Sequence, residues 1–186
     1  MFFICFLTFY VKYVILYLFK EIIERVSCMA LYYIEQLRQL VNSDKWPYDI
    51  GDWNEKLNES TNCLAFALGL PYPDESHAIF VPTSSKSLES FCCNILSCTN
   101  LEFRKISSCK EAQKDELVVV GFEFISPLTK KESFHFIRKN LDGKWYHKTG
   151  WHMSSEEINW NSFDYLYPSD SFTSSFILAV KKRTSY

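Results

Sequence analysis

A run of β-branched and aromatic residues, ELVVVGFEFIS at positions 116–126, constrains the fold of this chain more than any other segment. Residues of these types favour extended structure and pack well on a pleated sheet, so the run predicts a strong strand near the centre of a sheet. Further strands are predicted at 101–106 and 172–181. The second half of the chain is therefore expected to form an antiparallel sheet.

Two more strands are predicted on either side of the sequence LDG, where SFHFIRKN comes before and KWYHKTG after. Asp-Gly is typical of a two-residue hairpin turn. With Asp142 and Gly143 in that turn, Arg138 pairs with His147, to within one or two residues of register. His135 and His147 are thus expected as near neighbours on adjacent strands.

The first half of the chain has helical spacing instead. Apolar residues recur at intervals of three and four over three stretches: 32–41, 61–68, and from Ser84 or Ser85 to about Cys98. Gly69 is expected to end the middle helix, and Ser60 or Thr61 to cap its start. Helices followed by antiparallel strands predict a single α+β domain over residues 29–186.

The composition excludes some functions. Hydrophobic residues make up 47% of the chain, which is enough for a sizeable core. The formal net charge of -2 gives no electrostatic case for binding nucleic acid. The seven cysteines include no CxxC pair and no zinc spacing with histidine, so we expect reduced, mostly buried thiols. No metal and no organic cofactor is expected.

The N-terminal segment 1–28 contains an apolar run from Phe2 to Phe19, broken by Lys12. The run is just long enough to span a bilayer, but it lacks the basic start and small-residue cleavage site of a signal peptide. It could be a membrane anchor, a helix packed on the domain, or sequence upstream of a true start at Met29, which we favour. The protein is expected in the cytoplasm in the last case, and at the membrane or exported if the run is translated.

Cys63 begins the predicted helix in STNCLAFALG. A cysteine nucleophile reacts as the thiolate, and a helix N-terminus lowers the pKa of a thiol through its unpaired N–H groups and its dipole. The N–H of Cys63 could also help to hold an oxyanion. The alternative is that Cys63 packs as a small hydrophobic residue at the start of a buried helix.

His135 is the candidate for the base that a cysteine nucleophile needs. Its neighbours Phe134 and Phe136 are expected on the opposite face of the strand, because strand side chains alternate. His147 on the next strand could orient the His135 ring as the third member of a triad. His152 and Asp164 are the alternatives for that third position.

The segments NCLAFAL and FHFIRKNLDGKWYHKTGW resemble the papain-like cysteine hydrolases of the NlpC and CHAP type, in particular an uncharacterised bacterial branch. In those bacterial domains the nucleophile opens a helix that packs on an antiparallel sheet. A histidine opens one strand, and often a second histidine lies twelve positions later, as His135 and His147 do. The resemblance covers roughly residues 45–150 and implies a papain-like fold, with Cys63 as nucleophile, His135 as general base and His147 as orienting residue.

The resemblance implies a cysteine peptidase or amidase, a hydrolase that cleaves an amide or peptide bond through a thiol acyl-enzyme. The substrate is expected to be a peptide, cell-wall peptide among the candidates, and the protein a monomer. Upstream asparagines and two tryptophans are candidates for oxyanion or substrate contacts: Asn54, Asn58, Asn62, Trp145 and Trp151. An acyl transferase with the same Cys–His pair, and a non-catalytic binding or structural protein on this fold, remain alternatives.

Overall fold

The computed structural model describes residues 34–49, 52–53, 57, 59, 61–71, 87–99, 101–149 and 154–183. The chain divides into two compact units, Met1–Gln36 and Leu37–Tyr186, and the second contains the whole sheet. The apolar run Phe2–Phe19 and the proposed start at Met29 lie outside the described residues. Within the described ranges, no helix is both long and apolar enough to cross a membrane.

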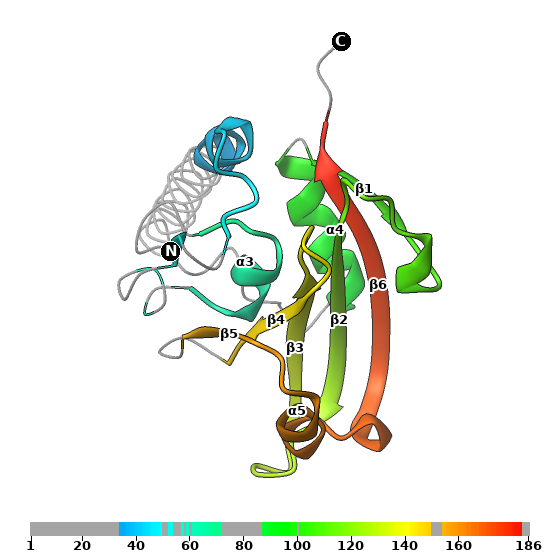
Figure 1. Ribbon diagram of the computed structural model, residues 1–186. Coiled ribbons are helices and arrows are strands. Elements are labelled where there is room, and N and C mark those ends of the chain that lie inside the picture. The colour runs from blue at the N-terminus through cyan, green and yellow to red at the C-terminus, as the bar shows by residue number, and fades with distance from the viewer. Residues whose placement is uncertain are drawn as a thin grey trace, which may run out of the picture. The chain divides into compact units, whose positions relative to one another are not determined.

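The second unit is built on one six-stranded antiparallel sheet, with the strand order β1-β6-β2-β3-β4-β5 (Figure 1). The strands are β1 Leu101–Lys105, β2 Leu117–Ile125, β3 Glu132–Lys139, β4 Trp145–Lys148, β5 Ser155–Glu157 and β6 Phe172–Lys182. The α+β class and the antiparallel sheet are as predicted. The strand β2 lies inside the sheet between β6 and β3, which confirms the central position expected for the 116–126 run.

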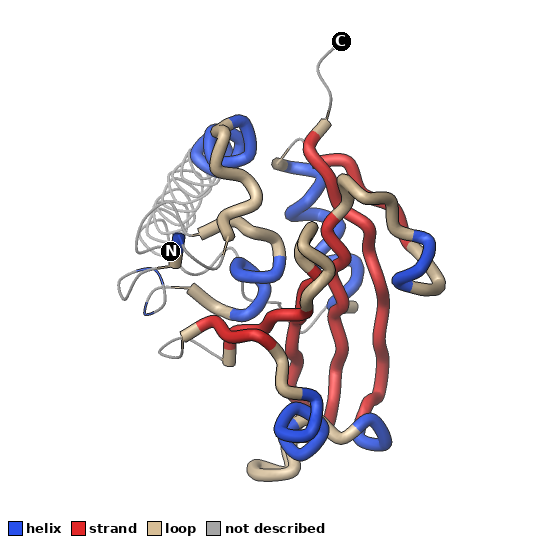
Figure 2. Tube along the Cα trace, viewed as in Figure 1, coloured by secondary structure: helices blue, strands red, loops and turns tan. Residues whose placement is uncertain are grey.

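Along the chain, helices lie before β1 and between β5 and β6 (Figure 2). They include α3 Cys63–Ala67, α4 Leu88–Cys98 and α5 Trp160–Leu166, with short 3-10 turns at Cys109–Glu111 and Ser169–Ser171, and a further helix covers residues 34–42. In α4, Leu88, Cys92 and Leu96 are buried at four-residue intervals, as the helical pattern predicts. The cap of α4 is Ser87 and not Ser84 or Ser85, because the hydroxyl of Ser87 accepts the N–H of Ser90.

The two faces of the sheet carry different cores. On one face Phe136, Phe176 and Leu178 pack with residues of α3 and α4. On the other face Phe122 and Ile137 pack with Phe163 and Tyr167 from the α5 region. The alternation of strand side chains produces this division, since Phe136 and Ile137 are neighbours in β3 and lie in different cores.

Gly121 lets two aromatic rings close over the middle of β2. A Cβ atom there would lie 2.5 Å from Cζ of Phe176 and 2.7 Å from Cε1 of Phe136. Both rings belong to the core beneath α3 and α4. A side chain at this position would therefore displace the core on which α3 rests.

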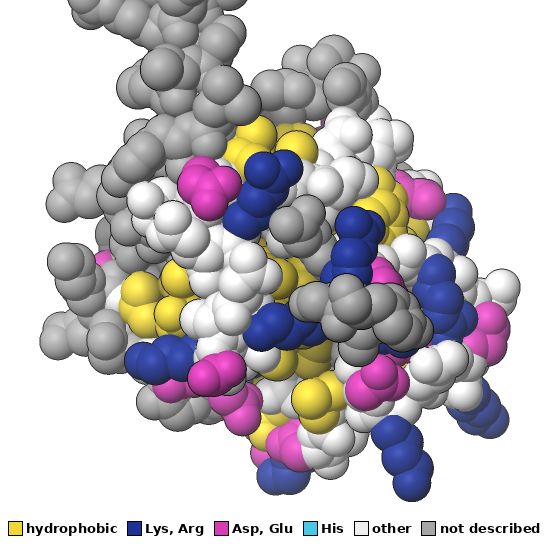
Figure 3. Space-filling view, turned by 90° about the horizontal axis from the view of Figure 1, so that it is seen from above, with side chains coloured by type: hydrophobic (Ala, Val, Ile, Leu, Met, Phe, Trp, Pro, Cys, Tyr) yellow, Lys and Arg dark blue, Asp and Glu magenta, His cyan; other side chains and the backbone are white. Residues whose placement is uncertain are grey.

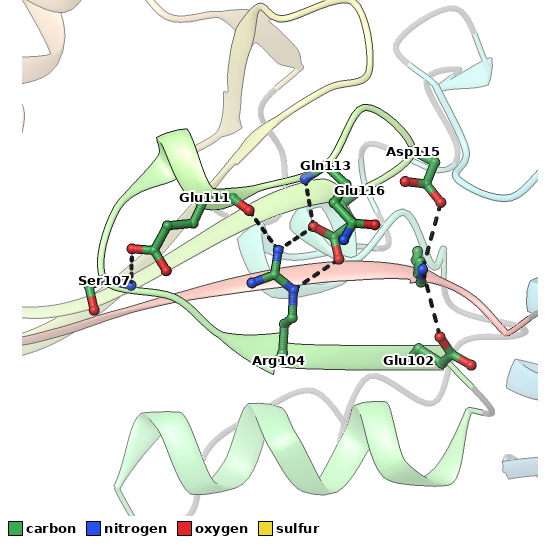
Figure 4. Close-up of polar contacts among 8 residues, drawn as sticks. Glu102, Arg104, Ser107, Glu111, Gln113, Asp115 and Glu116 are labelled. Atoms are coloured by element: carbon green, nitrogen blue, oxygen red, sulfur yellow. Dashed lines mark hydrogen bonds and ion pairs between the residues drawn. The ribbon is translucent and has the colours of Figure 1, made fainter.

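An ion-pair network ties β1 to the start of β2 (Figure 4). Arg104 donates to Glu116 from Nε at 3.1 Å and from Nη2 at 2.8 Å, and its Nη2 also donates to the carbonyl of Glu111 at 2.7 Å. The N–H of Gln113 donates to Glu116 at 2.7 Å. Glu116 is buried and satisfied on both oxygens, so the network is a structural tie.

Candidate active site

Cys63 is the first residue of α3, and its cap is Asn62 rather than Ser60 or Thr61. Asn62 Oδ1 accepts the N–H of Ala65 at 3.0 Å, which satisfies one of the unpaired amides at the helix start. The helix ends at Ala67, shortly before Gly69 takes a φ of 63°. The predicted helix is therefore confirmed in place, but it is shorter than the 61–68 expected.

The capping hydrogen bond also determines the role of the Asn62 side chain. Its Oδ1 atom is engaged within α3, and the residue is buried. Asn62 thus holds Cys63 at the first helical position. The oxyanion role expected for Asn62 would have to come from its amide nitrogen and stays a prediction.

The hairpin closes with a three-residue loop and not with the predicted two-residue turn. Asn140 donates its N–H to the carbonyl of Lys144 at 2.9 Å, and Gly143 donates to Asn140 at 3.0 Å with a φ of 85°. A type I turn followed by a left-handed glycine has this pattern. His147 consequently pairs with Ile137, one position from the Arg138 expected.

With His147 opposite Ile137 instead of Arg138, the two histidines lie on the same face of the sheet. Ile137 and His135 are two positions apart in β3, so they share a face with His147. His135 Nε2 lies 3.2 Å from His147 Nδ1. His135 is 3% exposed and His147 is 4% exposed, so the contact between their rings is a buried polar contact. The expectation that His147 lies beside His135 is confirmed.

Helix α5, which is not among the predicted helices, encloses this pair. The ring of Tyr167, just after α5, stacks on His135 with 4.4 Å between centroids and an interplanar angle of 10°. Phe163 packs edge-on against His147 at 5.3 Å. The spacing of Phe163, Leu166 and Tyr167, with Asn159 as cap, is the signal that could have predicted this helix.

Burial keeps both imidazoles uncharged. It is the largest cause that lowers the pKa of His135 well below its ordinary value, and the charge of His147 adds to this effect. Burial also lowers the pKa of His147, although Glu156 opposes it. Since a neutral ring has one N–H and one bare nitrogen, the contact between the rings is a hydrogen bond between neutral groups.

Cys63 is part of the core that includes Phe136, whereas the ring of His135 contacts residues of the other core. Cys63 packs with Phe136, and His135 packs with Phe122 and Tyr167. Within the described residues, the hydrogen bond of His135 goes to His147, and none joins its ring to the thiol.

The thiol lies beside the backbone of β3. The N–H of Phe136, the residue directly after His135, lowers the pKa of Cys63, which places Sγ near that amide. Tyr167 has its pKa raised to about 12, mainly by burial, and the charge of the Cys63 thiolate adds to this. The thiol is thus within electrostatic reach of the ring that stacks on His135.

The pKa of Cys63 does not move in the direction expected for a helix N-terminus. Burial raises it to about 11. The N–H groups of Phe136, Leu64 and Cys63 itself and the ammonium of Lys148 oppose this rise without outweighing it. The resting sulfur is therefore protonated near neutral pH, because desolvation exceeds the stabilisation that a short helix start provides.

Two basic residues of the hairpin, Arg138 and Lys148, are buried. Lys148 is fully buried, and burial lowers its pKa to about 8, with the Cys63 thiolate opposing. Arg138 donates from Nη1 to the carbonyl of Phe66 at 3.0 Å and from Nη2 to Tyr48 at 2.9 Å. Arg138 thereby fastens α3 to β3. On the face seen in Figure 3, basic and acidic side chains are interspersed.

Of the other candidate site residues, the structure describes Trp145 and Asp164. Trp145 is half-buried on β4, on the face of the histidines, and packs against Trp160 with 6.0 Å between centroids. Asp164 is exposed on α5. Asn54, Asn58, Trp151 and His152 lie outside the described residues.

No protein-family model matches this chain, and no curated protein is similar to it. The function therefore has to be argued from the geometry of the described residues.

Proposed function

We propose that this protein is a cysteine-dependent hydrolase of an amide or peptide bond, with a papain-like arrangement of a helix and an antiparallel sheet. The observation that carries the proposal is the buried contact of 3.2 Å between His135 Nε2 and His147 Nδ1. A buried histidine whose ring is held by a second polar group is the arrangement of a base and its orienting residue.

The position of Cys63 supports the same proposal. It opens a helix on β3 and β4, and its thiol lies near the N–H of the residue that follows His135. Nε2 of His135 is engaged in the contact with His147, so Nδ1 is the nitrogen of His135 that can accept a proton. Contacts between nucleophile and base are often long in a resting enzyme and shorten when substrate binds.

The pKa values favour a neutral resting pair. The thiol keeps its proton, and His135 is uncharged. In the reaction, Sγ of Cys63 forms a bond to the substrate carbonyl carbon as its proton passes to His135 Nδ1. The C–N bond then breaks, and the leaving amine takes that proton. Water next attacks the thioester, which gives a carboxylic acid and restores the thiol.

A second function is favoured by one specific observation. Cys63 is only 5% exposed and is part of a continuous apolar core. A non-catalytic binding or structural protein on the same fold would have this feature, because a buried cysteine is inert. An acyl transferase would use the same residues as the hydrolase, with an amine in place of water.

Acylation by an activated ester tests the proposal on the full chain. p-Nitrophenyl acetate transfers its acetyl group to a reactive thiol and releases p-nitrophenolate, and intact-mass and peptide mass spectrometry locate the adduct. We expect acetylation of Cys63 at neutral pH and a rate at least about a hundredfold lower in His135→Ala. Cys93→Ser, which removes a half-buried thiol on α4, is the matched control and is expected to react like the wild type.

Two outcomes would overturn the proposal. Either Cys63 stays unmodified while other thiols react, or it is acetylated equally fast in His135→Ala. In both cases the binding or structural protein is favoured. If Cys63 is acetylated as expected, stem peptides of peptidoglycan and unrelated peptides, offered with and without an added amine, separate peptidase, amidase and transferase.

A further inference from the structure

Glu156 adds a third polar group to the histidine pair. It lies on β5, opposite His147 in the register of β4 and β5. Glu156 Oε1 lies 3.3 Å from His147 Nε2, and His147 Nδ1 lies 3.2 Å from His135 Nε2. Three neighbouring strands thus contribute one side chain each to a continuous row of polar contacts, in which both nitrogens of His147 are engaged.

The row has a direction, because a carboxylate can only accept hydrogen bonds. With Glu156 as acceptor, His147 carries its hydrogen on Nε2. A neutral imidazole has a single N–H, so His147 Nδ1 is bare and accepts from His135. His135 then carries its hydrogen on Nε2, and its Nδ1 is bare.

The direction depends on His147 being neutral. A doubly protonated His147 would donate from Nδ1, so His135 would accept at Nε2 and carry its hydrogen on Nδ1. The small exposed fraction of His147, 4%, disfavours that cation. Glu156 itself is exposed, with 69% of its side chain accessible, so its charge is partly screened and does not force a second proton onto the ring.

We propose that Glu156 is a positioning residue that selects the tautomers of both histidines and thereby leaves Nδ1 of His135 as the proton acceptor of the site. The tautomers are a property of the resting protein. Only the use of that acceptor by Cys63 rests on the proposed function.

Nitrogen NMR of the imidazole rings tests the selection directly. Long-range ¹⁵N–¹H correlation spectra at pH 7.5 distinguish a protonated from a bare ring nitrogen, and variants of His77 and His152 assign the remaining signals. We expect a bare Nδ1 in His135 of the wild type. In Glu156→Ala we expect the fraction with a bare Nδ1 to fall from nearly all molecules to about half, because the charge-assisted contact is lost.

Two further variants separate this effect from a general change of β5. Glu156→Gln keeps a carbonyl acceptor and is expected to restore the wild-type tautomer at least in part. Glu157→Ala removes the neighbouring carboxylate, which pairs with Lys144 at 2.8 Å, and is expected to leave the ring signals unchanged. Folding of all variants is checked in the same spectra.

The proposal is overturned if His135 of the wild type carries its hydrogen on Nδ1, or if Glu156→Ala leaves both rings unchanged. Its failure is distinguishable from failure of the proposed function. The acetylation rate of Cys63 is expected to fall roughly tenfold in Glu156→Ala. If Cys63 is unreactive in every variant while the tautomers change as expected, the hydrolase is wrong and the role of Glu156 stands.

Discussion

Asn62 holds Cys63 in place through one buried hydrogen bond. Its side chain closes the start of α3, and Arg138 fastens the same helix to β3 through the carbonyl of Phe66. At the scale of single residues, Cys63, the proposed nucleophile, is therefore positioned by polar groups that have no part in the proposed reaction. Each of these ties can be removed separately.

Asn62→Ala is expected to lower the free energy of unfolding by about 1 to 2 kcal/mol, because the buried N–H of Ala65 loses its acceptor. Urea unfolding at pH 7 measures the loss. Asn62→Ser keeps a capping hydroxyl and is expected to lose less. Equal losses in the two variants would contradict the capping role.

Glu116→Gln tests the ion pair with Arg104 through its pH dependence. The hydrogen bond from Arg104 is the main cause that lowers the pKa of Glu116. Its contribution is therefore complete above the unfolded pKa of about 4.3 and is lost as the pH falls through the lower folded pKa. We expect Glu116→Gln to cost about 1 kcal/mol at pH 7. Urea unfolding of both proteins at pH 7 and pH 3 should show this difference shrink in acid; a constant difference would exclude the charged pair as its source.

At the scale of elements, α5 decides the environment of the histidines. It covers their face of the sheet with Phe163, and Tyr167 follows at its end. Since burial is the largest cause that lowers the pKa of both rings, the helix controls their protonation without a charged group of its own in contact with them.

Phe163→Ala is expected to lower the free energy of unfolding by about 3 kcal/mol and to raise the pKa of both histidines toward ordinary values. Proton NMR titration of the imidazole signals measures the second effect. Tyr165→Ala, an exposed position of the same helix, is the control and should change neither quantity. Histidine pKa values that stay low in Phe163→Ala would show that α5 is not their cause.

These elements also mark how far the sequence alone could predict the molecule. The strand β2 and the helix α4 follow from patterns long enough to identify, in ELVVVGFEFIS and in the buried series Leu88, Cys92 and Leu96. The short helix α5 has a weaker pattern, since its few apolar residues lie among Asn, Ser and Asp. The register differs by one residue from the predicted pairing because Asp-Gly suits two kinds of turn. The pKa of Cys63 is raised and not lowered, because its burial is set by residues distant in the chain.

At the scale of the whole second unit, the proposed reaction joins a thiol and an imidazole that pack with different cores. Cys63 lies in the core beneath α3 and α4, and the histidines lie in the core beneath α5. The backbone of β3 brings the amide of Phe136 near the thiol, and Tyr167, which stacks on His135, lies within electrostatic reach of the same thiol. The unit also carries two buried neutral imidazoles, which affect its response to acid.

The free energy of unfolding is expected to be nearly constant just above pH 6.5 and to fall below it. Both histidines have folded pKa values under their unfolded values, so the unfolded chain binds more protons as the pH drops. Each can contribute a slope of up to about 1.4 kcal/mol per pH unit. Urea unfolding at pH 7.5 and 5.5 measures the fall, and His135→Gln/His147→Gln is expected to flatten it. A wild-type stability that is equal at both pH values would contradict the buried, neutral pair.

The three-residue loop 141–143 has a consequence for how this site could be lost. The same sequence can close the hairpin with Asp142 and Gly143 alone, and that closure would slide β4 by one residue and turn His147 toward the opposite side of the sheet. Asp142→Asn would strengthen this competitor, because Asn-Gly is strongly preferred in two-residue turns. A surface change distant from both rings could thus uncouple them while Cys63, His135 and His147 themselves stay unchanged.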